Sequence, residues 1–230
     1  MSSLHEELLP ESLPSNPMQT ADEWFGLANR ERLQPNPDAM VIATAGTDGR
    51  PSARVVLCKK FVPDPGFVVF FTNYGSRKAI EMEDRPEVAA VFHWDMLRRQ
   101  MRIEGRVVRS PAEESDEYFA SRSWKSRIGA WASRQSRSVA DRPALLRQVA
   151  ETAQRFGVSF RDGRFAEIDS PPVVERPPFW GGYRLWISRL ELWVEGEGRV
   201  HDRALWERRL TPDPDGAVVT GPWTATRLQP

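Results

Sequence analysis

The sequence has one cysteine, no excess of charge of either sign and no long apolar run. With Cys58 alone no intramolecular disulfide can form, which fits a reducing compartment without proving one. The 32 basic and 32 acidic residues balance, so no global field favours nucleic acid or an anionic membrane. No stretch approaches the roughly 20 apolar residues of a membrane-spanning helix, and the N-terminus has no signal-like apolar core. These absences predict a cytoplasmic globular protein.

Motifs of several common enzyme classes are also missing. No group of His, Cys and carboxylate residues has a metal-ligand spacing, so the sequence predicts no metal site. A G-x-G-x-x-G unit, a P-loop and a G-x-S-x-G elbow are all absent. The lone cysteine has no evident base beside it and is given no catalytic task. The candidates that remain for a functional site are cationic and aromatic side chains.

Short apolar segments separated by turns predict a mainly β fold. Segments rich in Val, Ile and Phe occupy residues 40–45, 54–58, 67–71, 88–93 and 101–108, and further strands are predicted at 183–194, 200–207, 217–219 and 224–228. Closely spaced short strands are typical of an antiparallel barrel. The late strands are expected to rejoin the same sheet, because five short strands alone close a barrel poorly.

Helices are predicted between and around these strands. Start signals are the capping box at Thr20, Ser76 before a helix to Asp84, Ser110 followed by Pro111, and Asp141 before a helix that stops at Gly157. Residues 158–178 lack periodicity and carry several prolines, which indicates a loop. We therefore expect a mainly β protein with flanking helices (α+β), in which residues 1–18 form a flexible N-terminal arm and residues 19–230 form a single domain.

A glycine turn followed by a cationic helix start is the first candidate site. Residues 72–78 read Thr-Asn-Tyr-Gly-Ser-Arg-Lys, so Arg77 and Lys78 fall in the first turn of the next helix. Cations are unfavourable there, because the helix dipole places partial positive charge at the N-terminus. A bound phosphate would resolve the conflict by accepting from free backbone N–H groups and from both side chains. A solvated basic turn is the alternative interpretation.

Two other sets of polar residues have spacings that suit an anion. Arg54 lies in an apolar strand with Lys59 at its end, and a cation that faces into a barrel needs a partner. Tyr118 and Arg122 are four residues apart on a predicted helix, so they share a face and could bind an oxyanion; Ser126 follows four residues later. In both cases an ordinary solvent-exposed position is the alternative.

Residues 199–203, Arg-Val-His-Asp-Arg, form the densest polar cluster. On a strand, Arg199, His201 and Arg203 would point to one face. Several potential cations on one face are unfavourable unless an anionic or π-rich group lies there. A solvent-facing strand edge is the alternative interpretation.

Together these segments resemble the pyridoxine/pyridoxamine 5′-phosphate oxidase family, whose members are FMN enzymes of the split-barrel fold. The match runs from about residue 37 to residue 230. It is carried in order by Arg54-Val55-Val56-Leu57 with Lys59, residues 71–78, Arg99-Gln100, Tyr118-Phe119 with Ser121-Arg122, Ser126, residues 128–131, Arg134-Gln135-Ser136, residues 179–183, Glu191-Leu192-Trp193, residues 199–203 and residues 227–230. Each piece is weak alone, but their shared order makes coincidence improbable.

The resemblance implies a homodimer with FMN in clefts between the subunits. By position, it implies that FMN is held by Arg54, Phe71, Thr72, Arg77, Lys78, Gln100, Gln135, Ser136, Trp193 and Arg203. It assigns the substrate phosphate to Lys59, Tyr118, Arg122 and Ser126. The catalytic pair that it implies is Arg199 and His201, which would contact the pyridine ring over the flavin.

The reaction implied is oxidation of pyridoxamine or pyridoxine 5′-phosphate to pyridoxal 5′-phosphate, by hydride transfer from C4′ to flavin N5, with release of H₂O₂ after reaction with O₂. The N-terminal arm lacks the Arg-x-x-Tyr segment that often covers the substrate in this family, and the loop before Phe179 is longer than usual. Two alternatives stay open: a related split-barrel FMN oxidase of the phenazine-biosynthesis type, and a non-catalytic protein that binds flavin or pyridoxal phosphate.

Overall fold

The computed structural model describes residues 8–213 and 218–230. Residues 1–7 of the predicted arm and Ala217 of a predicted strand lie outside this part of the chain. The described residues form two compact units, one drawn from residues 8–70, 81–108, 184–213 and 218–230 and the other from residues 71–80 and 109–183. In the described residues, no helix has the length and apolar character needed to cross a membrane.

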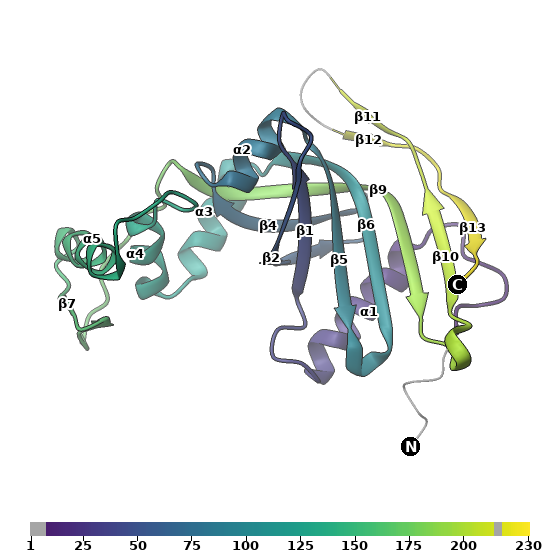
Figure 1. The fold of residues 1–230 in the computed structure, drawn as a ribbon, viewed down its shortest axis with the longest axis horizontal. Helices are drawn as coiled ribbons and strands as arrows, with labels where there is room; N and C mark the ends of the chain where they lie inside the picture. The colour runs from purple at the N-terminus through teal and green to yellow at the C-terminus, as the bar shows by residue number, and fades with distance from the viewer. Residues whose placement is uncertain (1–7, 214–217) are drawn as a thin grey trace. The chain divides into compact units, whose positions relative to one another are not determined.

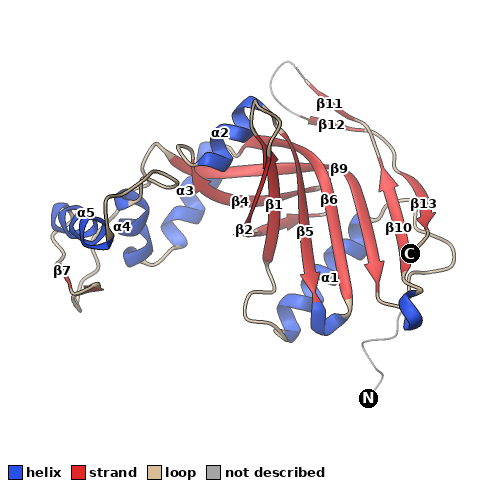
Figure 2. Cartoon of the chain, in the orientation of Figure 1, coloured by secondary structure: helices blue, strands red, loops and turns tan. Residues whose placement is uncertain are grey.

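The first unit is built on a mostly antiparallel sheet, which confirms the predicted mainly β fold with flanking helices (Figures 1 and 2). The strands of the sheet are β1 (Ala39–Ala45), β2 (Pro51–Leu57), β3 (Lys60–Val62), β4 (Phe67–Asn73), β5 (Glu87–Trp94), β6 (Arg99–Arg109), β9 (Trp180–Val194), β10 (Asp202–Glu207) and β13 (Thr224–Leu228), of which residues 71–73, 109 and 180–183 belong to the second unit. The order across the sheet is β13-β10-β9-β6-β5-β1-β2, and β4 pairs with β3 and β9. As predicted, the late strands β9, β10 and β13 join the same sheet as the early ones.

Alternation along the strands separates a buried face from an open one. In β6, Met101 and Ile103 are fully buried, whereas Arg102 and Glu104 are partly exposed. Helix α1 (Met18–Glu31) lies across the buried face (Figure 1). Phe25 of this helix stacks on Phe61 of β3 with ring centroids 5.5 Å apart and meets Phe92 of β5 edge-on at 5.8 Å. The core of this unit therefore lies between α1 and the sheet.

Gly105 in β6 marks a place where two strands approach closely. A Cβ atom at this position would lie 1.8 Å from the backbone oxygen of Trp186 in β9. Backbone cannot rotate away as a side chain can, so the strands would have to separate. We expect Gly105→Ala to lower the free energy of unfolding by about 2–3 kcal/mol, measured by urea denaturation. Gly129→Ala, inside a helix and with nothing within 4 Å of the added atom, is the control and should raise the free energy of unfolding by about 0.5–1 kcal/mol.

The second unit contains three helices, α3 (Ala112–Ser121), α4 (Trp124–Ala132) and α5 (Arg142–Arg155). The predicted start of α5 is confirmed, because the side chain of Asp141 accepts a hydrogen bond from the backbone N–H of Ala144. Its predicted stop is confirmed by Gly157, whose φ of +72° suits glycine. Buried apolar residues that include Phe119, Ile128 and Trp180 form the core of this unit.

Four predicted elements differ from the structure. The first helix begins at Met18, not at the Thr20 capping box, because the side chain of Asn16 accepts the backbone N–H of Met18. The predicted helix over Tyr118, Arg122 and Ser126 is two helices, since Arg122 is extended and Ser123 caps α4. The predicted loop also contains a short hairpin of β7 (Phe160–Arg161) and β8 (Arg164–Phe165). The strand predicted at 217–219 was expected to rejoin the main sheet, but its described part lies in β12 (Val218–Thr220), which pairs with β11 (Leu210–Pro212) in a separate small sheet.

Candidate functional site

In the second unit, the turn between β4 and α2 (Arg77–Asp84) brings three predicted ligand residues together. Lys78 is buried, and its Nζ donates to Thr72 Oγ1 at 2.8 Å, to Gln135 Oε1 at 3.2 Å and to Ser76 Oγ at 3.2 Å. Thr72 Oγ1 in turn donates to Gln135 Oε1 at 2.9 Å. Residues that are distant in sequence thus form one hydrogen-bonded cluster at the end of β4.

The same turn is shaped by its own polar groups. The side chain of Asn73 accepts the backbone N–H of Gly75 at 2.8 Å, and its amide donates to the carbonyl of Ser133 at 3.1 Å. Arg77, the first residue of α2, is exposed, and Ser136 adopts a φ of +68°. Strained backbone of this kind in a residue other than glycine persists only where its surroundings hold it, and it is common at binding sites.

Three aromatic rings of the second unit form a stack beside two predicted substrate residues. Phe71 and Tyr118 lie 4.1 Å apart between ring centroids with an interplanar angle of 18°. Trp180 is nearly parallel to both, at 5.5 Å from Phe71 and 6.2 Å from Tyr118. The guanidinium of Arg122 lies over the Trp180 ring at 4.8 Å. The stack therefore joins a predicted cofactor residue, Phe71, to the predicted phosphate residues Tyr118 and Arg122.

Arg122 is a half-buried cation with an unsatisfied donor. Its Nη1 is buried and has no hydrogen-bond partner. Burial lowers the pKa of this guanidinium, while the neighbouring Tyr118 acts in the opposite direction. An unpaired buried N–H of a charged group is costly, so a partner that arrives from outside would be strongly favoured. Ser126, by contrast, is exposed on α4 and hydrogen-bonds Ser123.

In the first unit, the predicted ligand residues Arg54 and Lys59 each have a carboxylate partner. Arg54 contacts Glu81 at 3.3 Å between Nη2 and Oε2 and donates to Thr44 Oγ1 at 2.6 Å. Lys59 Nζ lies 2.6 Å from Asp38 Oδ2. Arg54 is therefore paired with a buried glutamate, which is the partner that an inward-facing cation requires.

The predicted strand over Arg199, His201 and Arg203 is wrong in its first part. Residues Glu197–Arg199 form a short 3-10 turn, and β10 begins only at Asp202, so Arg199 and His201 do not share a strand face with Arg203. Arg199 is exposed with a φ of +66°. The physical reason is Gly196, where a Cβ atom would lie 1.7 Å from the carbonyl oxygen of Val200, so the chain folds back on itself.

His201 is nevertheless held in a defined orientation. Its ring lies 4.6 Å from the Trp193 ring, and Trp193 is the cross-strand neighbour of Arg203. His201 Nδ1 accepts the backbone N–H of Gly196 at 3.2 Å. In the neutral imidazole the proton must then be on Nε2, which makes that nitrogen a hydrogen-bond donor. Gln100, the remaining predicted ligand, is partly exposed on β6.

The sequence analysis did not identify the residues that pack against or pair with these predicted binding residues. Trp180 and the buried carboxylates Glu81 and Glu191 were given no role, although a charged residue within the apolar run of β9 was a signal that could have identified Glu191. Cys58 is buried, and burial raises the pKa of its thiol to about 12, which makes it a poor nucleophile.

Comparison with solved structures defines the class first. PhzG from Burkholderia lata 383, solved in complex with tetrahydrophenazine-1-carboxylic acid, matches with a TM-score of 0.78 at 30% identity, over 99% of this chain and 100% of that one. A pyridoxamine 5′-phosphate oxidase-related, FMN binding protein from Nostoc punctiforme PCC 73102 matches with a TM-score of 0.64 at 18% identity, over 93% and 97% of the two chains, and shows the fold alone. The chain is a split-barrel protein.

Family models and relatives then identify the family. The model of pyridoxamine 5′-phosphate oxidase matches residues 28–156, and that of the pyridoxine 5′-phosphate oxidase C-terminal dimerisation region matches residues 180–230. Proteins named pyridoxine/pyridoxamine 5′-phosphate oxidase are 47% identical in Rubrobacter xylanophilus, over 94% of this chain and 87% of the relative, and 46% identical in Burkholderia cenocepacia, over 94% and 89%. The chain belongs to the pyridoxine/pyridoxamine 5′-phosphate oxidase family of oxidoreductases.

Proposed function

We propose that this protein oxidises pyridoxamine or pyridoxine 5′-phosphate to pyridoxal 5′-phosphate with bound FMN, O₂ as the acceptor and H₂O₂ as a product. The amine substrate also consumes one water and releases ammonia, whereas the alcohol does not. The observation that carries the proposal is Arg122, whose buried Nη1 has no partner and which lies on an aromatic stack beside Tyr118. A phosphate ester attached to a flat ring supplies what this place needs. Its oxygens satisfy the guanidinium, and the stack provides an apolar wall.

The donors around Lys78 fit the phosphate of FMN. The cluster combines a buried ammonium with the hydroxyl groups of Thr72 and Ser76, next to the exposed Arg77 at the start of α2. The three N–H groups of Lys78 donate to Thr72, Ser76 and Gln135, so Lys78 would exchange one of these partners for the phosphate. Cationic and hydroxyl donors at a helix start are the groups that bind phosphate in proteins. In this proposal Lys78 and Arg77 bind the cofactor phosphate, and Gln135 and Ser136 complete that end of the site.

The chemistry that FMN supplies is acceptance of a hydride from the substrate and its passage to O₂. The side chains of the protein bind and orient the substrate. Arg122 and Tyr118 hold the substrate phosphate, while Lys59 and Ser126 contribute from positions that already have polar neighbours. His201 donates from Nε2 to the substrate ring, and the exposed Arg199 clamps that ring. Such residues raise the reaction rate by fixing the ring at reacting distance.

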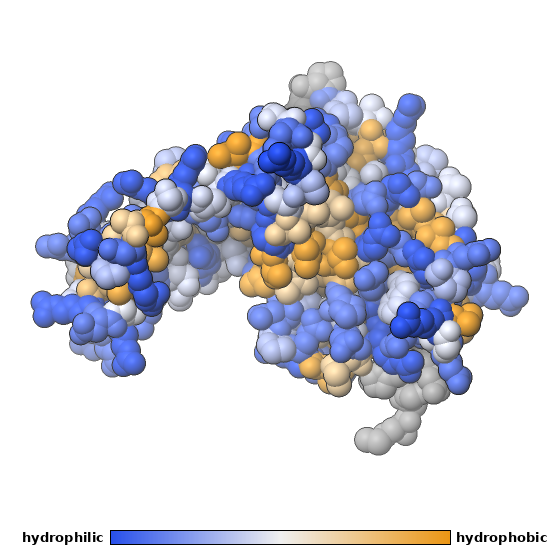
Figure 3. Space-filling model, viewed as in Figure 1, coloured by the Kyte–Doolittle hydropathy of each residue, from blue (hydrophilic) through white to orange (hydrophobic). Residues whose placement is uncertain are grey.

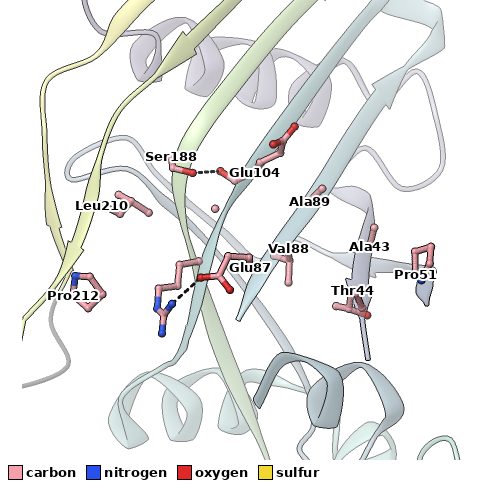
Figure 4. A pocket seen from close by; sticks show the side chains of 13 residues that line it. Ala43, Thr44, Pro51, Glu87, Val88, Ala89, Glu104, Ser188, Leu210 and Pro212 are labelled. Carbon is pink, nitrogen blue, oxygen red and sulfur yellow. Dashed lines mark hydrogen bonds and ion pairs between the residues drawn. The ribbon is translucent and has the colours of Figure 1, made fainter. Parts of the chain in front are cut away.

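We also propose that the functional unit is a homodimer with FMN at the subunit interface. On the open face of the sheet, Val41, Val55 and Leu57 are 42%, 63% and 38% exposed. Apolar side chains gather over β1 and β5 (Figure 3), and a hollow of about 550 Å³ on this face is lined by small residues such as Ala43 and Ala89 (Figure 4). Exposed apolar surface of this kind favours a partner, and the match to a dimerisation region supports a second copy.

The test is direct. The purified protein should carry a flavin absorbance spectrum and form aldehyde and peroxide in equal amounts from pyridoxamine 5′-phosphate. Unphosphorylated pyridoxamine should be a far poorer substrate, because it leaves Arg122 without its partner. A yellow protein that turns over neither compound would refute the proposed activity, and a protein that binds no flavin would refute the cofactor as well.

Arg199→Ala tests whether Arg199 orients the substrate ring. We expect kcat to fall roughly 100-fold, because the ring loses its orientation over the reacting atoms, while FMN stays bound. Steady-state kinetics and the flavin absorbance of the purified variant measure the two effects separately. Arg209→Ala, another exposed arginine of the same unit, should have no effect on either. Loss of flavin from Arg199→Ala would mean that the residue binds the cofactor instead.

A second function is favoured by one observation. The chain matches PhzG along its whole length, and that protein was solved with a tetrahydrophenazine carboxylic acid. A substrate of this kind has no phosphate, so it would not use the unpaired Nη1 of Arg122 in the same way. Oxidation of tetrahydrophenazine-1-carboxylic acid that is faster than that of pyridoxamine 5′-phosphate would decide for this alternative.

A further inference from the structure

A buried carboxylate on β9 holds one of the proposed flavin ligands. Glu191 is 5% exposed, and its Oε1 accepts from both Nε and Nη2 of Arg203, at 3.0 Å and 2.8 Å. Its Oε2 accepts from Arg102 Nη1 at 2.8 Å. One carboxylate on β9 thus links an arginine of β10 to an arginine of β6, the two strands that flank β9, and each of its oxygens accepts from a different arginine.

The orientation of Arg203 is fixed from two sides. Besides the two bonds to Glu191, its Nη1 donates to the backbone carbonyl of Gln229 at 2.8 Å. A guanidinium has five N–H donors in a rigid plane, so these contacts leave one N–H on each terminal nitrogen for a ligand. Arg203 is also the cross-strand neighbour of Trp193, which places an aromatic ring next to those donors.

We infer that Glu191 is a positioning residue that makes Arg203 a directed hydrogen-bond donor to the ring system of the flavin, not to its phosphate. The inference rests on the proposed function. Arg102 is also paired with Glu104, at 3.2 Å between Nη2 and Oε1, so the charge of Glu191 offsets that of Arg203 and the guanidinium offers little net attraction to a phosphate dianion. Its two free N–H groups point in fixed directions beside an aromatic side chain. They can donate to the carbonyl oxygens and ring nitrogens along the edge of a planar heterocycle.

The test compares two flavins that differ only in the phosphate. Apoprotein is titrated with FMN and with riboflavin, and binding is followed by quenching of flavin fluorescence. We expect Glu191→Gln to weaken both flavins by the same factor, about tenfold. The matched control is Glu195→Gln, which breaks an ion pair of 3.0 Å with Arg98 near the end of the same strand and should change neither affinity.

A double-mutant cycle separates positioning from general damage. If Glu191 acts through Arg203, the variant that combines Glu191→Gln with Arg203→Gln should bind both flavins no more weakly than Arg203→Gln alone. Additive losses would overturn the inference, as would a loss confined to FMN, which would place Arg203 on the phosphate.

Glu191→Gln leaves Arg203 without its carboxylate and Arg102 with Glu104 alone, so a second variant guards against failure to fold. Glu191→Asp keeps the charge but withdraws it by one methylene. It should weaken FMN and riboflavin together by about threefold, and unchanged affinity for both would overturn the inference. A wild-type protein that binds neither flavin would instead refute the proposed function itself.

Discussion

Replacing Arg122 by methionine is expected to lower kcat/KM for pyridoxamine 5′-phosphate by about 1,000-fold. The substitution keeps an apolar side chain against Trp180 but removes the guanidinium whose Nη1 is buried without a partner. Loss of a buried, charge-assisted contact to a phosphate costs roughly 4 kcal/mol, which corresponds to that factor. Steady-state kinetics with the phosphorylated substrate measure the effect.

The unphosphorylated vitamer provides the internal control for Arg122→Met. Pyridoxamine lacks the phosphate, so its low kcat/KM should change little in the variant. Arg155→Met is the matched protein control, because Arg155 is an exposed arginine over another tryptophan of the same unit, at 5.7 Å from the Trp131 ring. Equal losses for the phosphorylated and unphosphorylated substrates would show that Arg122 does not read the phosphate.

Replacing Lys78 by methionine should weaken the binding of FMN by about 100-fold while riboflavin binds as before. Lys78 is buried among Thr72, Ser76 and Gln135, and its ammonium is the proposed contact to the cofactor phosphate. A charge-assisted hydrogen bond in such a site contributes about 3 kcal/mol, or roughly a factor of 100. Fluorescence titration of the apoprotein with both flavins measures the difference.

Lys125→Met is the control for this prediction, since Lys125 is exposed at the start of α4 and lies over the Trp124 ring. It should leave both affinities unchanged. Together with Glu191→Gln, the pair of flavins assigns each cation to one part of the cofactor: a loss for FMN alone marks a phosphate contact, and an equal loss marks a ring contact. If Lys78→Met weakened riboflavin as much as FMN, the phosphate assignment would be wrong.

Much of the fold could be predicted from local patterns. Strand alternation in segments such as residues 101–108 and the capping residue Asp141 act over a few neighbouring residues, so the sequence reveals them directly. The predicted ends of helices and strands differ from the structure, because contacts with residues outside the local window decide where an element begins and ends. Asn16 starts α1 two residues early, and Gly196 lets the chain turn where a strand was predicted.

Local patterns in the chain were enough to predict the fold class, the family resemblance and the kinds of residue available for binding two phosphate-bearing ligands. Which cations already have partners is visible in the folded structure alone: Lys59 is paired with Asp38 and Arg203 with Glu191, while Arg122 keeps a buried nitrogen free of hydrogen bonds. The physical reason is that ion pairs and ring stacks depend on strand register and on packing between residues far apart in the chain. Spacing along the sequence carries no record of either.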